Sequence, residues 1–232
     1  MILLKKFLKL LIAVFSVIGL FAFSKIILFY LIPEIYLKKH FLTFISGGFL
    51  YILAWLFYFS KRKSFWSILE HELTHALFAL IFFKRIHYIS ASKHKGGMIK
   101  VDSGNVIIAL APYFFPLLTI ILLILKPFLL SKHQPYLNFL LGFTYFFHLL
   151  HVFREFHFDQ SDIRESGIIF SSIIILFLNI FFLGLILAAL SGAWTTIAEY
   201  LELGWQTGSQ NMKIILNFIF NFLKSSIIHL KF

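Results

Sequence analysis

The sequence predicts an all-α polytopic membrane protein, because its composition is strongly apolar and its apolar runs are long and bounded by basic residues. Of the 232 residues, 60% are hydrophobic and 13% are charged, and the mean hydropathy is +0.90. A soluble domain cannot bury that much apolar surface. A helix that crosses a bilayer needs about 20 apolar residues, and the runs of this chain supply about six transmembrane helices.

Charge and cysteine content narrow the class further. The chain has no cysteine, so disulfides and thiolate metal sites are excluded. The net charge is +11, and the Lys and Arg residues gather between the apolar runs. This pattern indicates contact with anionic lipid headgroups, and no nucleic-acid-binding motif is present. We expect a multi-pass integral membrane protein, located in a bacterial cell or inner membrane.

The first two apolar runs are Met1–Leu31 and Phe41–Phe59. A basic start followed by an apolar stretch is also the pattern of a cleaved signal peptide. We favour a retained span, because the apolar character continues past Lys25 and no clean cleavage site is present. In the second run, Gly47-Gly48 would let a neighbouring helix approach closely.

The third run, Ser64–Phe83, holds His71-Glu72-Leu73-Thr74-His75, which reads HExxH. On a helix, His71 and His75 lie one turn apart on the same face, where two imidazoles can take two corners of a zinc tetrahedron. Glu72 lies beside that face, where a carboxylate can accept a proton from an activated water and deliver it to a leaving amine. Ionisable residues in a membrane span are costly and mark functional sites by default.

Two other interpretations of this motif stay open. The cluster could lie near the end of its span, in contact with water, with the histidines in capping or packing roles. It could also hold a metal without catalysing a reaction.

The next two segments depart from the pattern of a continuous apolar helix. Residues Ile86–Asn105 alternate polar with apolar or β-branched residues around Gly96-Gly97, which predicts a small β-hairpin between the third and fourth spans. The fourth span, Val106–Leu125, is interrupted by Pro112 and Pro116. Prolines there kink a helix and free backbone carbonyls, which suits a segment on the wall of a cavity.

Tyr136–Phe153 and Ile168–Leu190 are the fifth and sixth predicted spans. The fifth carries His148 and His151 near one face. The acid-rich segment Arg154–Gly167 joins the two spans, and we expect most of it to be a solvated loop.

The C-terminal region contains Ile214–Leu223, which is apolar but too short to cross a bilayer and is interrupted by asparagines. We expect an interfacial amphipathic C-terminal helix there.

With six crossings, the Lys and Arg residues fall almost evenly on the two sides, so the positive-inside rule selects no orientation.

Taken together, these motifs resemble those of the M50 membrane metallopeptidases, the site-2 protease group, and its M50B-like branch most closely. The resemblance covers roughly residues 64–190. It rests on His71–Leu77 in an apolar helix, on the Gly-Gly hairpin, on Ala111-Pro112-Tyr113-x-x-Pro116 and on Gln160-Ser161-Asp162-Ile163. It implies a zinc peptidase that cuts peptide bonds in or near the membrane. His71 and His75 would be zinc ligands and Glu72 the general base.

The resemblance also implies an aspartate as the third ligand, but the usual Asn-Pro…Leu-Asp-Gly form of that motif is missing. Asp162 is the matching residue. Its nominal depth, near the opposite face from HExxH, favours His148 instead, with His151 and Asp159 as further alternatives. A fold-back of the polar segment into a wet cavity would reconcile Asp162 with the histidines.

The expected function is therefore that of a zinc-dependent, membrane-embedded endopeptidase, with Glu72 catalytic and Zn²⁺ bound by His71, His75 and Asp162. We expect a single metallopeptidase domain over residues 1–232, with its core at 64–190. Its partners would be the lipid bilayer and a membrane-protein or transmembrane-peptide substrate, without nucleic acid.

Two alternatives come from other classes. One is a non-catalytic zinc-containing membrane adaptor or chaperone. The other is a metal-ion transporter with histidines along its pathway, although transporters tend to show paired halves and none is visible here. A general base beside the ligands favours the enzyme.

Overall fold

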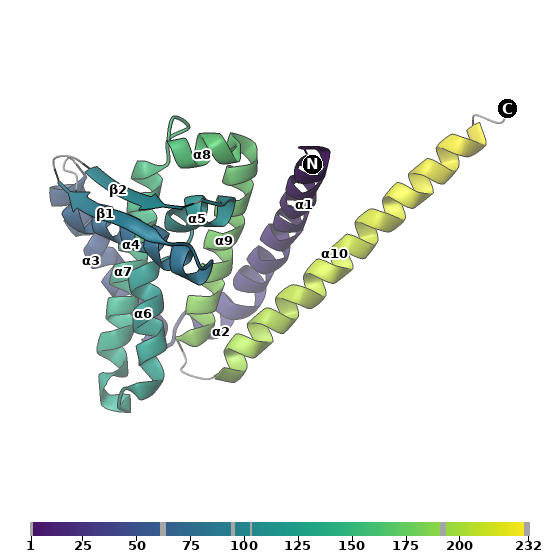
Figure 1. The fold of residues 1–232 in the computed structure, drawn as a ribbon. Helices are drawn as coiled ribbons and strands as arrows, with labels where there is room; N and C mark the ends of the chain where they lie inside the picture. Colours follow the sequence, from purple (N-terminus) through teal and green to yellow (C-terminus); the bar gives the residue numbers. More distant parts are fainter. Residues whose placement is uncertain (1, 61–63, 94–95, 103, 191–193, 230–232) are drawn as a thin grey trace.

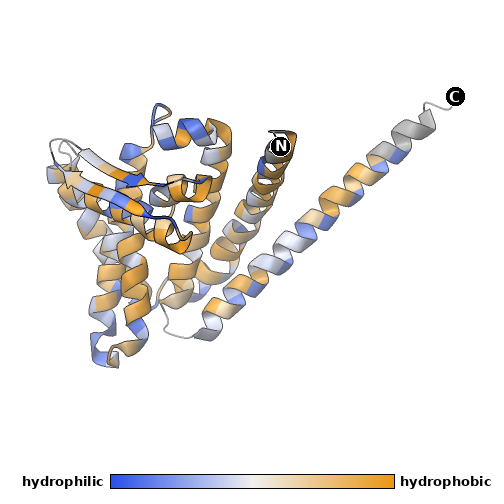
Figure 2. Ribbon diagram, in the orientation of Figure 1, coloured by the Kyte–Doolittle hydropathy of each residue, from blue (hydrophilic) through white to orange (hydrophobic). Residues whose placement is uncertain are grey.

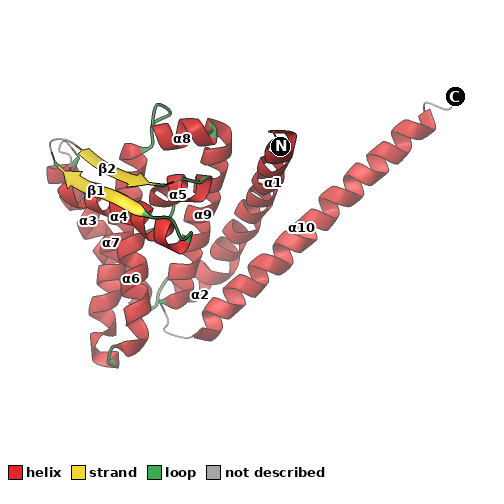
Figure 3. Cartoon of the chain, in the orientation of Figure 1, coloured by secondary structure: helices red, strands yellow, loops and turns green. Residues whose placement is uncertain are grey.

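The computed structural model describes residues 2–60, 64–93, 96–102, 104–190 and 194–229, which form a mostly helical molecule with one small hairpin against it (Figure 1 and Figure 3). The helices are α1 (Ile2–Ile26), α2 (Ile32–Ile35), α3 (Lys39–Ala54), α4 (Phe65–Ile81), α5 (Val106–Leu110), α6 (Leu117–Leu125), α7 (Gln134–Glu155), α8 (Ser161–Ser166), α9 (Ile168–Ala189) and α10 (Trp194–His229). The strands are β1 (Ile86–Ser92) and β2 (Gly96–Val101).

Four helical segments among the described residues are long and apolar enough to cross a membrane. They are Lys6–Ile35, Lys39–Phe59, Ser131–Glu155 and Ile168–Ala189. Helices α5 and α6 add a fifth if they count as one span, although a bend of 80° separates them. The count of six spans expected from the sequence is therefore not confirmed, and the predicted span that is missing from this set is α4.

Helix α4, which contains HExxH, has 17 residues and is not among the candidate spans of the described chain. It does not carry the chain from one end of the bundle to the other. Near its start, the side chain of Ser67 accepts a hydrogen bond from Arg154, at the last turn of α7. After α4 and the hairpin, the chain enters α5, which packs against α8, the helix that follows α7. Both points lie at one end of the bundle, called the α8 end below (Figure 1).

Close packing of α3 on α7 forms the centre of the bundle. A Cβ atom on Gly47 would meet the carbonyl of Phe139, and one on Gly142 would meet the carbonyl of Phe44. The two backbones therefore touch at positions where only glycine fits, as small residues allow in membrane helices. The expected close approach at Gly47-Gly48 is confirmed.

The interruption of the fourth apolar run is also confirmed. Pro112 lies in a single 3₁₀ turn, Ala111–Tyr113, and Pro116 precedes the first residue of α6. Two side chains satisfy backbone groups that the break would leave unpaired. Asn179 of α9 donates to the carbonyl of Tyr113 at 2.8 Å, and Glu70 of α4 accepts from the N–H of Leu118 at 3.4 Å.

The hairpin forms where the alternation predicts it, with β1 and β2 paired antiparallel and packed on α4. Gly96 and Gly97 belong to β2, where they pair with Ser92 and Ala91, and are not the centre of the turn. A Cβ atom on Gly97 would collide with the carboxylate of Glu72. The glycine is therefore needed for the approach of the strand to α4.

The C-terminal region differs from the sequence expectation. Residues 214–223 are not a separate short helix but part of α10, a continuous helix of 36 residues. The first half of α10 packs on α1 and α9, and its later part extends away from the other helices (Figure 1). Figure 2 shows hydrophilic residues along the hairpin, around α8 and at the turn between α6 and α7, whereas α1 and α9 are mostly hydrophobic.

Candidate metal centre

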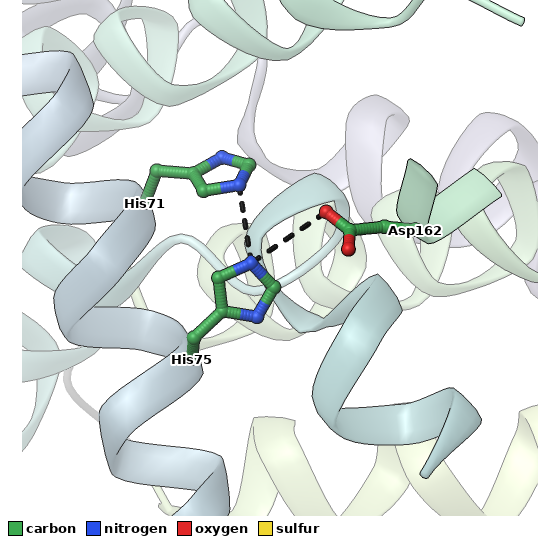
Figure 4. A group of neighbouring side chains, drawn as sticks. All are labelled: His71, His75 and Asp162. Atoms are coloured by element: carbon green, nitrogen blue, oxygen red, sulfur yellow. Dashed lines mark hydrogen bonds and ion pairs between the residues drawn. The ribbon is translucent and has the colours of Figure 1, made fainter. Parts of the chain in front are cut away.

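His71, His75 and Asp162 converge at the α8 end of the bundle (Figure 4). Each offers one ligand atom, and these three atoms all lie within 4.8 Å of one another. The Nε2 atoms of the two histidines are 3.2 Å apart, and His75 Nε2 is 3.7 Å from Asp162 Oδ2. The residue that the sequence placed at the opposite face thus lies beside the HExxH helix.

The arrangement fits a small divalent cation such as zinc. Ligand atoms on a tetrahedral zinc, each bound at roughly 2.0–2.1 Å, are about 3.3 Å from one another. Two of the three separations, 3.2 Å and 3.7 Å, are close to that value, and the third is at most 4.8 Å. Two imidazoles and one carboxylate are also a ligand set typical of catalytic zinc, with a fourth position left for water or substrate.

A backbone carbonyl fixes the orientation of His75. Its Nδ1 lies 2.8 Å from the carbonyl oxygen of Ile108 in α5. A carbonyl can only accept, so Nδ1 donates and the neutral ring keeps its lone pair on Nε2. That is the nitrogen that faces His71 and Asp162.

Asp162 reaches the histidines because α8 folds back against the bundle. Ile163, its neighbour, is fully buried among residues of α5, the 3₁₀ turn and α9. Gly167 lies between α8 and α9 with φ = 96°, a backbone conformation that glycine adopts readily. The hydroxyl of Tyr113 lies 3.5 Å from Asp162 Oδ2, at the outer limit of a hydrogen bond. The buried anchor and the turn therefore bring a polar segment to the site.

Glu72 is buried, with 6% of its surface exposed, and contacts Gly97 of β2. It lies close enough to His71, His75 and Asp162 to interact with them electrostatically. Glu72 and His71 line a cavity of about 520 Å³ whose other walls come from β2 and from the end of α7. The side chain proposed as base and one proposed ligand thus face the same polar space.

The other candidates for third ligand are not part of this group. His148 and His151 are both buried in α7. The Nδ1 atom of His151 lies 2.8 Å from the carbonyl of Phe147 and 3.3 Å from the hydroxyl of Tyr51, away from the metal cluster. Asp159 is exposed in the turn before α8. The kinked segment also differs from expectation, since Tyr113 contacts His71 and Asp162 but does not line the cavity.

Sequence reasoning missed two residues of the site. Glu155, expected in a solvated loop, contacts His71 and lines the cavity. Gly97, expected in a turn, covers Glu72. The position of Glu155, close in sequence to His148 and His151, was a signal for the first. Only the packing of β2 on α4 reveals the second.

The sequence matches no family model, and it matches no curated protein and no solved structure. The resemblance to the M50 group therefore stays a prediction that rests on the motifs of this chain.

Proposed function

We propose that this chain is a zinc-dependent, membrane-embedded endopeptidase that hydrolyses peptide bonds of membrane proteins in or near the bilayer. The observation that carries the proposal is the convergence of His71, His75 and Asp162, from two separate elements, beside a polar cavity that Glu72 also lines. Two imidazoles and a carboxylate can each present a lone pair to one shared cation, which is why the cluster supports a metal site.

His71, His75 and Asp162 would hold the zinc ion. Bound there, zinc would supply an activated water and polarise the scissile carbonyl. Glu72 would accept the proton of the attacking water and then donate it to the nitrogen of the leaving amine. Glu72 lies buried beneath β2, which limits its contact with bulk water. The contact with Gly97 would also restrain the carboxylate in position for this proton transfer.

The membrane arrangement that we propose has α1, α3, α7 and α9 as spans, with the bent pair of α5 and α6 as a fifth. Helix α4 would enter the bilayer from the α8 end and return through the hairpin without crossing. A non-crossing helix would explain how ionisable residues can stand in an apolar run, since His71 and Glu72 line a cavity at the α8 end.

Glu72→Gln is the decisive variant, because the amide keeps the size of the side chain but cannot accept the proton. Membrane peptides that accumulate in cells carrying Glu72→Gln, identified by mass spectrometry, supply candidate substrates. Purified protein reconstituted with such a peptide should cut it, while the variant should be slower by at least the ~10²-fold typical of removing a general base. Zinc content should be equal in both proteins.

Glu165→Gln is the matched control, because Glu165 is exposed on α8 and the change removes the same charge at the same end. It should cut at the parent rate. Full activity of Glu72→Gln would end the peptidase proposal. Bound zinc with no cleavage of any accumulating peptide by the parent would favour the adaptor class instead.

A further inference from the structure

Glu155, the last residue of α7, lies behind the ring of His71. Its Oε2 atom is 3.6 Å from His71 Nδ1, the ring nitrogen that faces away from the metal cluster. The other ring nitrogen, Nε2, faces His75. Glu155 therefore approaches the imidazole from the side opposite to the cation and is not itself placed as a ligand.

The carboxylate of Glu155 is held in place from its other side. Its Oε1 atom is 3.5 Å from Nη2 of Arg154. Arg154 in turn donates to the hydroxyl of Ser67 at 3.3 Å and to the carbonyl of Phe59 at 3.2 Å. Since Ser67 lies one turn before His71 on α4, the end of α7 is tied to the helix that carries the ligand.

The two ligand histidines thus have different partners on Nδ1. His75 donates to a neutral backbone carbonyl, that of Ile108. His71 faces a carboxylate instead. A carboxylate partner fixes the tautomer and makes the imidazole a stronger donor to the metal, and losing such partners typically costs 10–100-fold in metal affinity.

We infer that Glu155 is a positioning residue, which accepts a hydrogen bond from His71 Nδ1 and so aims Nε2 at the metal. The inference rests on the proposed metal site but goes beyond it, because it concerns how one ligand is held. The 3.6 Å separation is longer than a hydrogen bond. A small rotation of either side chain closes it, and a cation on Nε2 places the proton on Nδ1, where it faces the carboxylate.

The test is the affinity for Zn²⁺ alone, measured by competition with a chromophoric chelator on the full chain in detergent. Glu155→Ala should weaken zinc binding by about 10–100-fold. Glu155→Gln keeps an oxygen acceptor without the charge, so its loss should be smaller. Glu165→Gln, which removes an exposed charge nearby, should bind within about twofold of the parent.

Replacing zinc with cobalt supplies a measurement that would not change if Glu155 only stabilised the fold. The visible absorption of Co²⁺ reports the geometry and donor strength of its ligands, so the bands of Glu155→Ala should shift while those of Glu165→Gln stay in place. Zinc binding by folded Glu155→Ala within twofold of the parent would overturn the inference. If the alanine variant fails to fold, the glutamine variant decides by the same twofold limit. A parent that binds no zinc would refute the proposed metal site itself.

Discussion

The two ends of the helix bundle both bury polar and charged side chains, but they satisfy them differently. At the end opposite α8, the ammonium of Lys126 donates to Asn138 Oδ1 at 2.9 Å and to the carbonyls of Ala189 and Leu190 at 2.8 and 2.5 Å. Three donors meet three acceptors, and the cation lies at the C-terminus of α9, where the helix dipole favours it. The hydrogen bonds of Lys126 thus form a complete structural lock at this end, the Lys126 end.

At the α8 end, the polar groups are not paired with one another in this way. The Nε2 atom of His75 is shared between the Nε2 atom of His71 and the carboxylate of Asp162, so one nitrogen faces two partners. The comparison teaches that burial of charge is not by itself a functional signal. A group whose hydrogen bonds are complete stabilises the fold, whereas converging side chains that can ligate a metal make a candidate site.

The ends also differ in their number of basic residues. Described Lys and Arg residues in the segments at the α8 end are Lys6, Lys9, Lys84, Arg85, Lys93, Lys100, Arg154 and Arg164. Those at the Lys126 end are Lys38, Lys39, Lys126 and Lys132. With α4 proposed not to cross, we predict from the positive-inside rule that the α8 end faces the cytoplasm.

The largest expected effect is the all-or-none labelling of the two ends. The chain has no cysteine, so Lys100→Cys and Lys132→Cys each introduce a single thiol while removing the same charge. In intact cells a membrane-impermeant maleimide should label Lys132→Cys only, and after permeabilisation it should label both. Labelling of Lys100→Cys alone in intact cells would reverse the orientation.

The second prediction separates the metal centre from the buried histidines of α7. Asp162→Ala should weaken zinc binding on the order of 10²-fold or more, because two protein ligands hold a catalytic zinc poorly. His148→Ala should retain zinc, since His148 is not part of the converging group. Metal analysis of purified protein checks this, and loss of zinc with His148→Ala but not with Asp162→Ala would contradict the assignment.

The third prediction concerns the lock. Lys126→Met keeps the length of the side chain but removes its donors, so Asn138 Oδ1 and the carbonyls of Ala189 and Leu190 lose this partner. The free energy of unfolding should fall by about 2–3 kcal/mol, as is typical when buried polar groups lose a charged partner. Thermal unfolding in detergent measures the change, and zinc affinity should not move. Weakened zinc binding in a folded variant would show that the two ends are coupled.

The smallest effect is expected at the contact between the hairpin and the proposed base. In Gly97→Ala the new methyl group would meet the carboxylate of Glu72, so the strand or the carboxylate must shift. Cleavage should fall about tenfold, an effect of about 1.4 kcal/mol on the barrier, while zinc affinity stays near that of the parent. Gly104→Ala is the matched control, since nothing lies within 4 Å of the added atom. Equal rates for the two variants would show that β2 does not hold Glu72.

The sequence by itself determined the features that depend on local pattern. Hydropathy and run length predicted the candidate spans, since a helix must cover the bilayer with apolar residues within one continuous segment. Alternation predicted the hairpin, and Pro112 and Pro116 predicted the break, because both act through neighbouring residues. The spacing of His71 and His75 placed them on one face for the same reason.

Tertiary structure alone decided where those local elements go. Hydropathy cannot distinguish an apolar helix that crosses from one that enters and returns, so the sequence places HExxH and Asp162 at different nominal depths, whereas the structure brings them together. Burial of Ile163 and the turn at Gly167 bring Asp162 to the histidines, and packing of α7 on α4 brings Glu155 to His71. Each of these is a contact between residues far apart in sequence. The periodicity of one segment cannot predict such a contact, because the contact depends on how the surfaces of two packed elements fit together.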